Sequence, residues 1–323
     1  MLVSMNAAIA ANLAGLIALA AWMLSKTYPL TRAVRLRNAL VAREAVDTSF
    51  DWAPSNAPPG FRTETSAPLR VIADAVAGVD MQFCTDDWSR ALRLAEHLTR
   101  QARDLGAIQS DLSTTYTRIC DGYGYCADFV KVFLALAHAG NIFARQWAFA
   151  FDGFGGHGHT IVEVFDRQRS KWLFMDVYNN FHVCDAQTME PLGALEFRSA
   201  LLNGTPRIVL KPNGAGRAGY PIEEKLIKYY RSGLQEWYLL CGNAVFSYDA
   251  HPLVRLASRV SGGLGQIVGT FFGVYPSIQV LRTAENSDRV QQLNALAHRF
   301  RVALGLFALL LLLLAIQLFT KPA

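Results

Sequence analysis

Three residues in the middle of the sequence have side chains that together could perform nucleophilic chemistry: Cys126, His159 and Asp176. A thiol supplies a nucleophile, an imidazole supplies a general base, and a carboxylate can orient the imidazole and fix its tautomer. The thiolate attacks an acyl carbonyl and forms a thioester, which water or an amine can then resolve. These residues therefore predict a catalytic triad for acyl chemistry.

The sequence around Cys126 predicts that this thiol begins a helix. Residues 126–139 carry apolar residues at helical spacing, and Gly140 follows where a C-terminal cap belongs. Unpaired N–H groups and the helix dipole at a helix N-terminus lower the pKa of a thiol. Gly122 and Gly124 precede the helix and allow a sharp turn and a close approach of the substrate.

The histidine and the aspartate are expected on neighbouring strands. His159 begins a β-rich run over 160–165, and Asp176 lies near the end of a second run over 171–177. Residues 144–151 alternate as a half-buried strand does. Helices followed by an antiparallel sheet predict an α+β fold, with the helix-borne cysteine packed on the sheet.

Spacing alone leaves a structural role for Cys126 open, because free cysteines are often ordinary core residues. The stretch nevertheless resembles the core of the transglutaminase-like superfamily, within the papain-like cysteine enzymes. The resemblance rests on Gly124-Tyr125-Cys126-Ala127-Asp128, on Gly140 to Arg145, on His159-Thr160-Ile161-Val162-Glu163-Val164 and on Trp172 to Asp176.

This resemblance implies that Cys126 is the nucleophile, His159 the general base and Asp176 its orienting partner. The chain departs from the usual pattern of the superfamily where Thr160 and Ile161 replace an Ala-Trp pair, and where Val177 follows Asp176 with no proline after it. These differences affect packing and the walls of the substrate site more than the triad.

Several other residues are weaker candidates for a role in the site. The backbone N–H of Cys126 is a natural oxyanion donor, and Tyr116 or Trp88 could supply a second one. His157 is an alternative base or half of a metal pair, and Cys120 an alternative redox partner. Because no calcium-binding loop or further ligand cluster is visible, we expect neither a metal nor another cofactor.

Apolar segments at both ends of the chain set the expected domain order. Segments 1–25 and 301–320 each contain a run long enough to cross a hydrocarbon core of about 30 Å, although a signal peptide is an alternative for the first. Between them we expect a basic stem and Pro-rich linker over 26–66, the catalytic domain over 67–220, and a helical, membrane-interfacial region over 221–300. Residues 260–281 are free of charge, and a third span is the alternative there.

Basic residues flank the central region on both sides. They predict that this region is cytoplasmic in a plasma or inner membrane protein, with an extracytoplasmic placement as the alternative. The formal net charge of +5 then reflects proximity to anionic lipid and requires no nucleic acid. Five cysteines without a Cys-x-x-Cys pair suit a reducing compartment, where thiols stay free. The flanking residues are Lys26, Arg32, Arg35, Arg37, Arg43, Arg282, Arg289, Arg299 and Arg301.

These features predict a membrane-anchored thiol enzyme that cleaves or transfers an amide acyl group of a peptide or protein. Hydrolysis by a protease or amidase is favoured over transglutaminase activity, because no acceptor-amine site is recognisable. The alternative is a catalytically idle domain of the same kind that binds peptide or serves as a scaffold at the membrane.

Overall fold

An eight-stranded mixed sheet runs through the centre of the structure, a computed structural model that describes residues 2–204, 207–246 and 251–319. The strand order is β1-β8-β7-β2-β3-β4-β5-β6. Neighbouring strands are antiparallel except for β1 and β8, which are parallel. The strands are β1 (Ala42–Ala45), β2 (Ala144–Ala150), β3 (Gly158–Asp166), β4 (Lys171–Asp176), β5 (Phe181–Asp185), β6 (Ile208–Pro212), β7 (Trp237–Leu240) and β8 (Ile278–Leu281).

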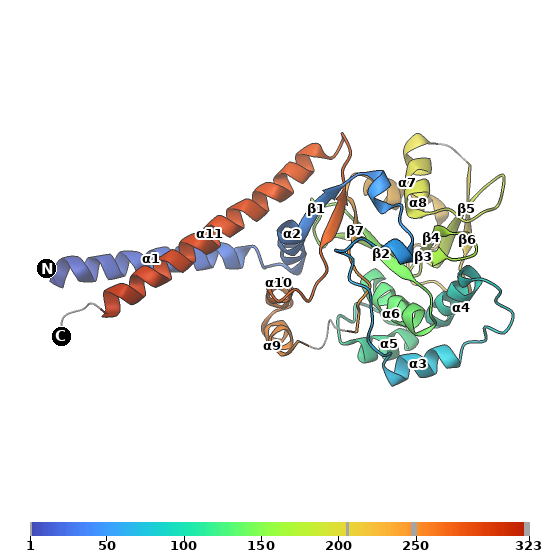
Figure 1. The fold of residues 1–323 in the computed structure, drawn as a ribbon, viewed down its shortest axis with the longest axis horizontal. Coiled ribbons are helices and arrows are strands. Elements are labelled where there is room, and N and C mark those ends of the chain that lie inside the picture. Colours follow the sequence, from blue (N-terminus) through green and yellow to red (C-terminus); the bar gives the residue numbers. More distant parts are fainter. Residues whose placement is uncertain (1, 205–206, 247–250, 320–323) are drawn as a thin grey trace.

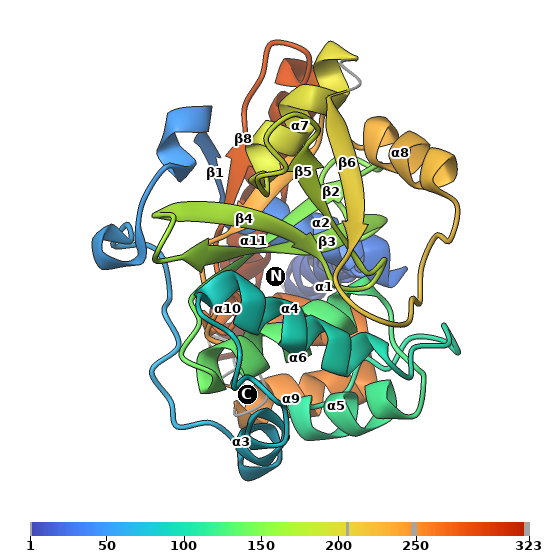
Figure 2. The same cartoon turned by 90° about the vertical axis from the view of Figure 1, so that its right-hand side faces the viewer.

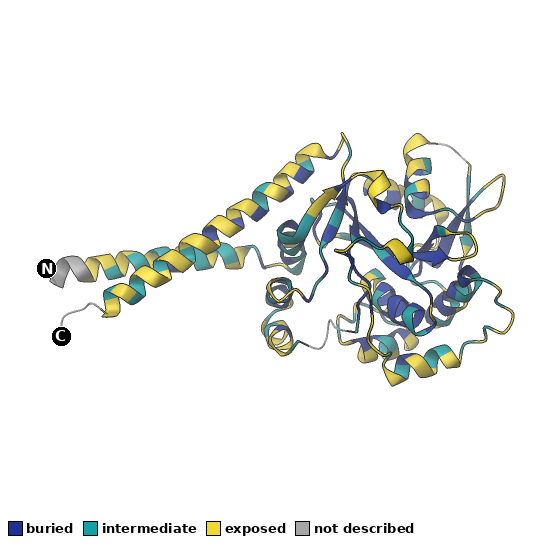
Figure 3. Cartoon of the chain, in the orientation of Figure 1, coloured by how far each residue is buried: buried dark blue, intermediate teal, exposed yellow. Residues whose placement is uncertain are grey.

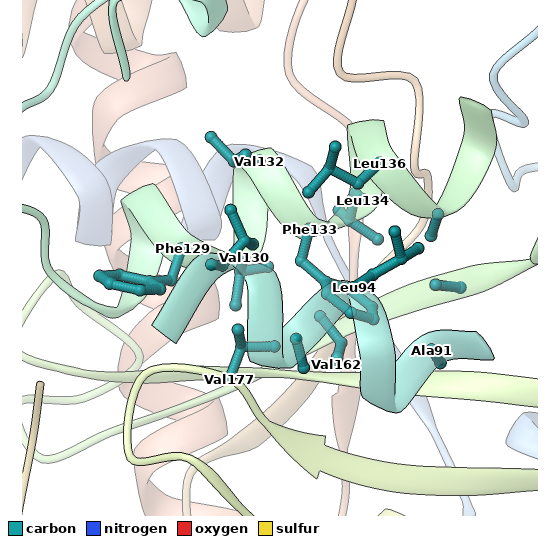
Figure 4. Packing of buried hydrophobic residues seen from close by; sticks show 14 of the residues in the cluster. Ala91, Leu94, Phe129, Val130, Val132, Phe133, Leu134, Leu136, Val162 and Val177 are labelled. Atoms are coloured by element: carbon teal, nitrogen blue, oxygen red, sulfur yellow. The ribbon is translucent and has the colours of Figure 1, made fainter. Parts of the chain in front are cut away.

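Four helices cover one face of the sheet (Figure 2): α3 (Arg70–Ala77), α4 (Asp87–Thr99), α5 (Leu112–Cys120) and α6 (Cys126–Ala139). Figure 4 shows the apolar side chains of α6 packed against α4 and the strands beneath them. Most of α6 is buried, because its sequence is apolar around nearly its whole circumference. The helix that carries Cys126 is therefore held rigidly by the core.

The opposite face of the sheet is covered by α7 (Ala194–Asn203) and α8 (Glu223–Ser232). Tyr230 of α8 is fully buried there, in one cluster with Ile161 of β3 and Phe174 of β4. Adjacent strand residues belong to the other cluster, because successive side chains of a strand point to opposite faces.

Two long helices extend from one end of this domain, and both chain ends lie at their far tips (Figure 1). In the described part of the chain, α1 (Leu2–Ser25) and α11 (Ser287–Phe319) are the two helices long and apolar enough to cross a membrane. Much of their surface is exposed (Figure 3). They lie side by side, and Asn12 Nδ2 of α1 donates a hydrogen bond to Gln317 Oε1 of α11 at 2.8 Å.

Three short helices lie where these long helices meet the domain (Figure 1): α2 (Leu30–Val41), α9 (Pro252–Val260) and α10 (Gly262–Phe271). Helix α10 packs against both α2 and α9. On its other side, α2 contacts the glycine-rich loop that follows β2, because the N–H of Gly156 donates to the carbonyl of Thr31 at 3.2 Å.

The predicted α+β class is confirmed, and so are the elements around the candidate triad. Helix α6 has the predicted bounds, and Gly140 is its C-terminal cap. Strands β3 and β4 are antiparallel neighbours, as predicted for the two runs that carry His159 and Asp176. The sheet as a whole, however, is mixed instead of antiparallel.

Two predicted regions differ from the structure. The prediction of a helical region over 221–300 is wrong for Trp237–Leu240 and Ile278–Leu281, which join the sheet as β7 and β8. Gly233 ends α8, and the chain then turns back toward β2. The predicted stem over 26–66 likewise contains β1, which pairs with β8.

These strands also change the expected domain and membrane boundaries. The sheet takes β1, β7 and β8 from outside the predicted catalytic segment 67–220, so that segment does not form the whole domain. Residues 260–281 contain α10, a connection and β8 instead of one helix long enough for a third span.

Candidate active site

Cys126 is the first residue of α6, as its sequence context predicts. The chain reaches this point through Gly124, whose φ of +114° is a left-handed conformation that favours glycine. A Cβ added at Gly124 would lie 3.0 Å from the Phe129 ring, so the turn also needs the missing side chain. Cys126 itself is half-buried, and it lies at the helix end where N–H groups have no intrahelical partners.

Asp128 fixes the backbone just before this cysteine and in a neighbouring loop. Its buried carboxylate accepts hydrogen bonds from the N–H groups of Tyr125 at 2.9 Å and of Ile108 and Gln109 at 3.1 Å each. One side chain therefore joins the start of α6 to the loop that precedes α5. The sequence resemblance includes Asp128, but its role as a positioning residue emerges only from the structure.

His159 and Asp176 form a buried pair on adjacent strands. The register places Val162 opposite Met175, which brings the start of β3 beside the end of β4. The His159 Nε2 atom lies 2.7 Å from Asp176 Oδ2, and both side chains are almost completely buried. Because Asp176 is hydrogen-bonded to Nε2, Nδ1 is the ring nitrogen that remains to exchange a proton with the Cys126 thiol.

Two further side chains donate hydrogen bonds to the Asp176 carboxylate. Tyr230 Oη donates to Oδ2 at 2.6 Å from α8, and Asn179 Nδ2 donates to the same oxygen at 2.6 Å. The Asn179 backbone N–H donates to Oδ1 at 2.9 Å, and Asn213 Nδ2 donates to the Asp176 carbonyl at 2.9 Å. The carboxylate is thus held in one orientation by His159, Asn179 and Tyr230, which come from three separate segments.

The charges in this site favour a thiolate–imidazolium pair. Burial opposes ionisation of Cys126, but the charge of His159 and a hydrogen bond to it hold the pKa of this thiol below its ordinary value. Burial would also lower the pKa of His159, but the Asp176 and Cys126 charges raise it to about 10. Burial of Asp176 is likewise outweighed by the imidazolium and by Asn179, which lower the pKa of its carboxyl group.

Aromatic rings surround the imidazole and limit its contact with water. Four ring centroids lie 5.6–6.2 Å from that of His159. Burial and Asp176 raise the pKa of Tyr230 well above its ordinary value, so its hydroxyl remains a donor. A low-polarity surrounding strengthens the interaction between the charges of the triad. The rings belong to Phe149, Tyr178, Tyr229 and Tyr230.

The weaker candidates from the sequence either contact other side chains or are exposed. The Tyr116 hydroxyl lies 2.9 Å from His97 Nε2, and the Trp88 ring packs edge-on against His182. His157 is exposed in the loop before β3, whereas His159 contacts Asp176. Cys120 is an exposed residue at the end of α5, although partial burial of its sulfur atom raises the pKa of its thiol.

Neither of two cavities in the structure is lined by a triad residue. One cavity of about 320 Å³ is lined by α4, by the segment before it and by Asn213, and another of about 530 Å³ is lined by α8. Within residues 2–204, 207–246 and 251–319, no three His, Cys, Asp or Glu side chains gather as a metal site.

We also compared the chain with known proteins. No family model, curated protein or solved structure matches it. The likeness to transglutaminase-like domains therefore rests on the sequence motifs quoted above.

Sequence reasoning missed the residues that support Asp176. Asn179 carries a local signal, because Asp and Asn are typical turn residues whose side chains bond nearby backbone groups. Tyr230 and Asn213 carry no such signal, because they reach the site from α8 and from the end of β6 through the tertiary fold.

Proposed function

We propose that this protein is a membrane-anchored thiol enzyme that acts on an amide bond of a peptide or protein. The arrangement of Cys126, His159 and Asp176 carries the proposal, since each side chain engages the next. A domain that only binds peptide has no chemical need for a thiol of lowered pKa beside a buried imidazolium.

In the first half of the reaction, the Cys126 thiolate attacks the amide carbonyl carbon. The C–N bond then breaks, and the amine leaves with the proton that the His159 imidazolium donates. The acyl group remains on sulfur as a thioester. Asp176 keeps the imidazole in place and stabilises its charged form.

In the second half, neutral His159 removes a proton from water as the water oxygen attacks the thioester. The C–S bond breaks, a carboxylic acid leaves and the thiolate–imidazolium pair forms again. An amine in place of water would give a new amide and a transglutaminase-type product. Hydrolysis is the reaction that we favour, because no acceptor-amine site is recognisable.

The anchoring part of the proposal uses α1 and α11 as two membrane-spanning helices. Basic residues next to both helices then favour the cytoplasmic side for the domain. The exposed residue Cys120 offers a test, because at mildly alkaline pH a membrane-impermeant maleimide should label its thiol only when the cytoplasmic face is accessible. Labelling from the opposite face would instead place the domain on the extracytoplasmic side of the membrane.

The decisive experiment is the pH dependence of Cys126 alkylation in the full chain, followed at each cysteine by mass spectrometry. We expect Cys126 to react well below pH 7, and His159→Ala to remove this reactivity. His157→Ala is the matched control, because this nearby imidazole is exposed. Cys120 is an internal reference whose raised pKa should confine its reaction to alkaline pH.

A Cys126 thiol that titrates like Cys120 and is indifferent to His159→Ala would refute the triad. If the ion pair is present, a screen of peptide amides against the parent and Cys126→Ala then separates an enzyme from an idle binding domain. The enzyme loses turnover on this substitution, whereas a binding domain keeps its ligand.

A further inference from the structure

The α9 helix exposes an apolar stripe although it belongs to the folded domain. Leu253, Leu256 and Val260 lie at helical spacing i, i+3 and i+7 and are 48%, 58% and 73% exposed. Val254 points the other way and is buried. Three large apolar side chains in one stripe are unusual on a surface that faces water.

The α9 and α10 helices form a hairpin, and the end of α10 also exposes apolar side chains. Gly265 of α10 approaches Ser258 of α9 so closely that a Cβ would clash with its side chain. The Phe272 ring, just after α10, lies 4.6 Å from His251 at the start of α9. Phe271 and Phe272 are both more than half exposed. We call the exposed side chains of Leu253, Leu256, Val260, Phe271 and Phe272 the hairpin apolar face.

Contacts with the end of α1 fix the position of this hairpin relative to the spanning helices. A Cβ at Gly263 would overlap the carbonyl of Thr27, which lies two residues after the end of α1. Trp22 near the end of α1 lies under the Lys26 ammonium group, 5.2 Å from ring centroid to nitrogen. Trp and Lys at a helix end are typical anchors of the membrane–water interface. The hairpin turn is therefore at the level of this interface.

The orientation of the hairpin suits a membrane surface. In Figure 1, α9 and α10 are seen nearly along their axes, whereas α1 and α11 lie across the view. Figure 2 shows the reverse, with α9 lying across the view. The short helices thus run across the direction of the spanning helices, as a helix lying in the plane of a bilayer does.

Charge decides the kind of surface that the hairpin fits. Arg255 and Arg259 are exposed on α9 beside the apolar stripe. Long basic side chains next to apolar residues can reach headgroups while their neighbours enter the acyl boundary. A membrane-surface helix with this pattern prefers anionic lipid.

We propose that the α9–α10 hairpin lies in the membrane interface, with its apolar face in the acyl boundary and Arg255 and Arg259 on anionic headgroups. This site is separate from the thiol chemistry, but it rests on the proposed anchoring by α1 and α11. It gives the domain a second contact with the bilayer and holds α2, which supports the loop before His159, at a fixed depth.

The test uses tryptophan quenching by brominated phosphatidylcholine in nanodiscs that contain the full chain. Leu256→Trp places a reporter in the hairpin, and Leu202→Trp on α7 is the matched control, with 53% exposure of the parent residue. We expect a greater fractional loss of emission than in the parent for Leu256→Trp and no added loss for Leu202→Trp. An unchanged fractional loss for Leu256→Trp would overturn the proposal.

Trp22 separates failure of the hairpin from failure of the anchor. If α1 spans the bilayer, the emission of the parent is quenched at Trp22, and Trp22→Phe should abolish this quenching. If Trp22 is not quenched, the proposed anchoring is overturned, and the hairpin proposal with it. Added phosphatidylglycerol should increase quenching of Leu256→Trp, and this increase should disappear when Arg255→Gln and Arg259→Gln are introduced. An increase that survives both substitutions would overturn the assigned role of these arginines.

Discussion

Replacing Tyr230 by phenylalanine tests whether the buried hydroxyl supports the Asp176 carboxylate. The hydroxyl donates to Oδ2 at 2.6 Å, and the ring is enclosed by Phe149, Phe181 and Phe197. Phenylalanine keeps the ring, so the substitution removes the hydrogen bond with little change in packing. A hydrogen bond to a charged group contributes roughly 1.5–3 kcal/mol.

A loss of about 2 kcal/mol lowers the Tm of a domain of this size by roughly 4–8 °C. The buried free thiols of Cys184 and Cys241 provide the assay, because a thiol-reactive dye labels them when the domain unfolds. Tyr229→Phe is the matched control. Its hydroxyl donates to the neutral carbonyl of Gly158 at 3.1 Å, so we expect a smaller decrease in Tm.

The pH dependence separates the hydrogen bond from packing. The pKa of Asp176 is lowered in the folded state, so its ionised form stabilises the fold at neutral pH. This contribution is lost as the pH falls through the folded pKa. The decrease in Tm caused by Tyr230→Phe should therefore shrink in acid, whereas that of Tyr229→Phe should not. A deficit for Tyr230→Phe that is absent, or equal at all pH values, would refute the reasoning.

Three other substitutions test the elements that position the site. Asp128→Asn should accelerate hydrogen exchange of the two loop amides that donate hydrogen bonds to this carboxylate. The exchange rates of the α7 amides are the control. Gly124→Ala places an alanine at a φ that strains its backbone, at a cost of about 1–3 kcal/mol in folding free energy. The substitution should raise the pH at which Cys126 is alkylated. Glu163→Gln leaves buried Arg145 without its charge partner and should destabilise the domain by about 3–5 kcal/mol, measured as Tm. Exposed Glu190→Gln should cost about 0–1 kcal/mol, and equal losses for the two glutamates would contradict this assignment.

Local sequence patterns predicted the elements that carry the candidate triad. The apolar spacing that defines α6 is continuous over the helix, and the β3–β4 hairpin has a polar turn between two β-rich runs. Both depend on neighbours close in sequence. Their prediction therefore did not require knowledge of the tertiary fold.

The strands that the sequence did not predict depend on partners that are distant in sequence. Strands β1, β7 and β8 have four residues each, too few for a clear alternation, and become strands because the sheet offers them an edge. The sequence pattern around Tyr230 indicates no more than the apolar side of a helix. The Tyr230 hydroxyl acquires a role because α8 packs over the end of β4.

The parallel pairing of β1 with β8 bears on when the protein can assemble during synthesis. β1 lies shortly after α1, whereas β8 lies just before α11, so their contact closes most of the chain into one loop. Contacts of such high sequence separation form slowly and cannot form before the last strand has left the ribosome. The nascent chain therefore contains all three triad residues long before its sheet is complete. Completion of the sheet that carries His159 and Asp176 is tied to synthesis of the C-terminal quarter, immediately before the second apolar helix.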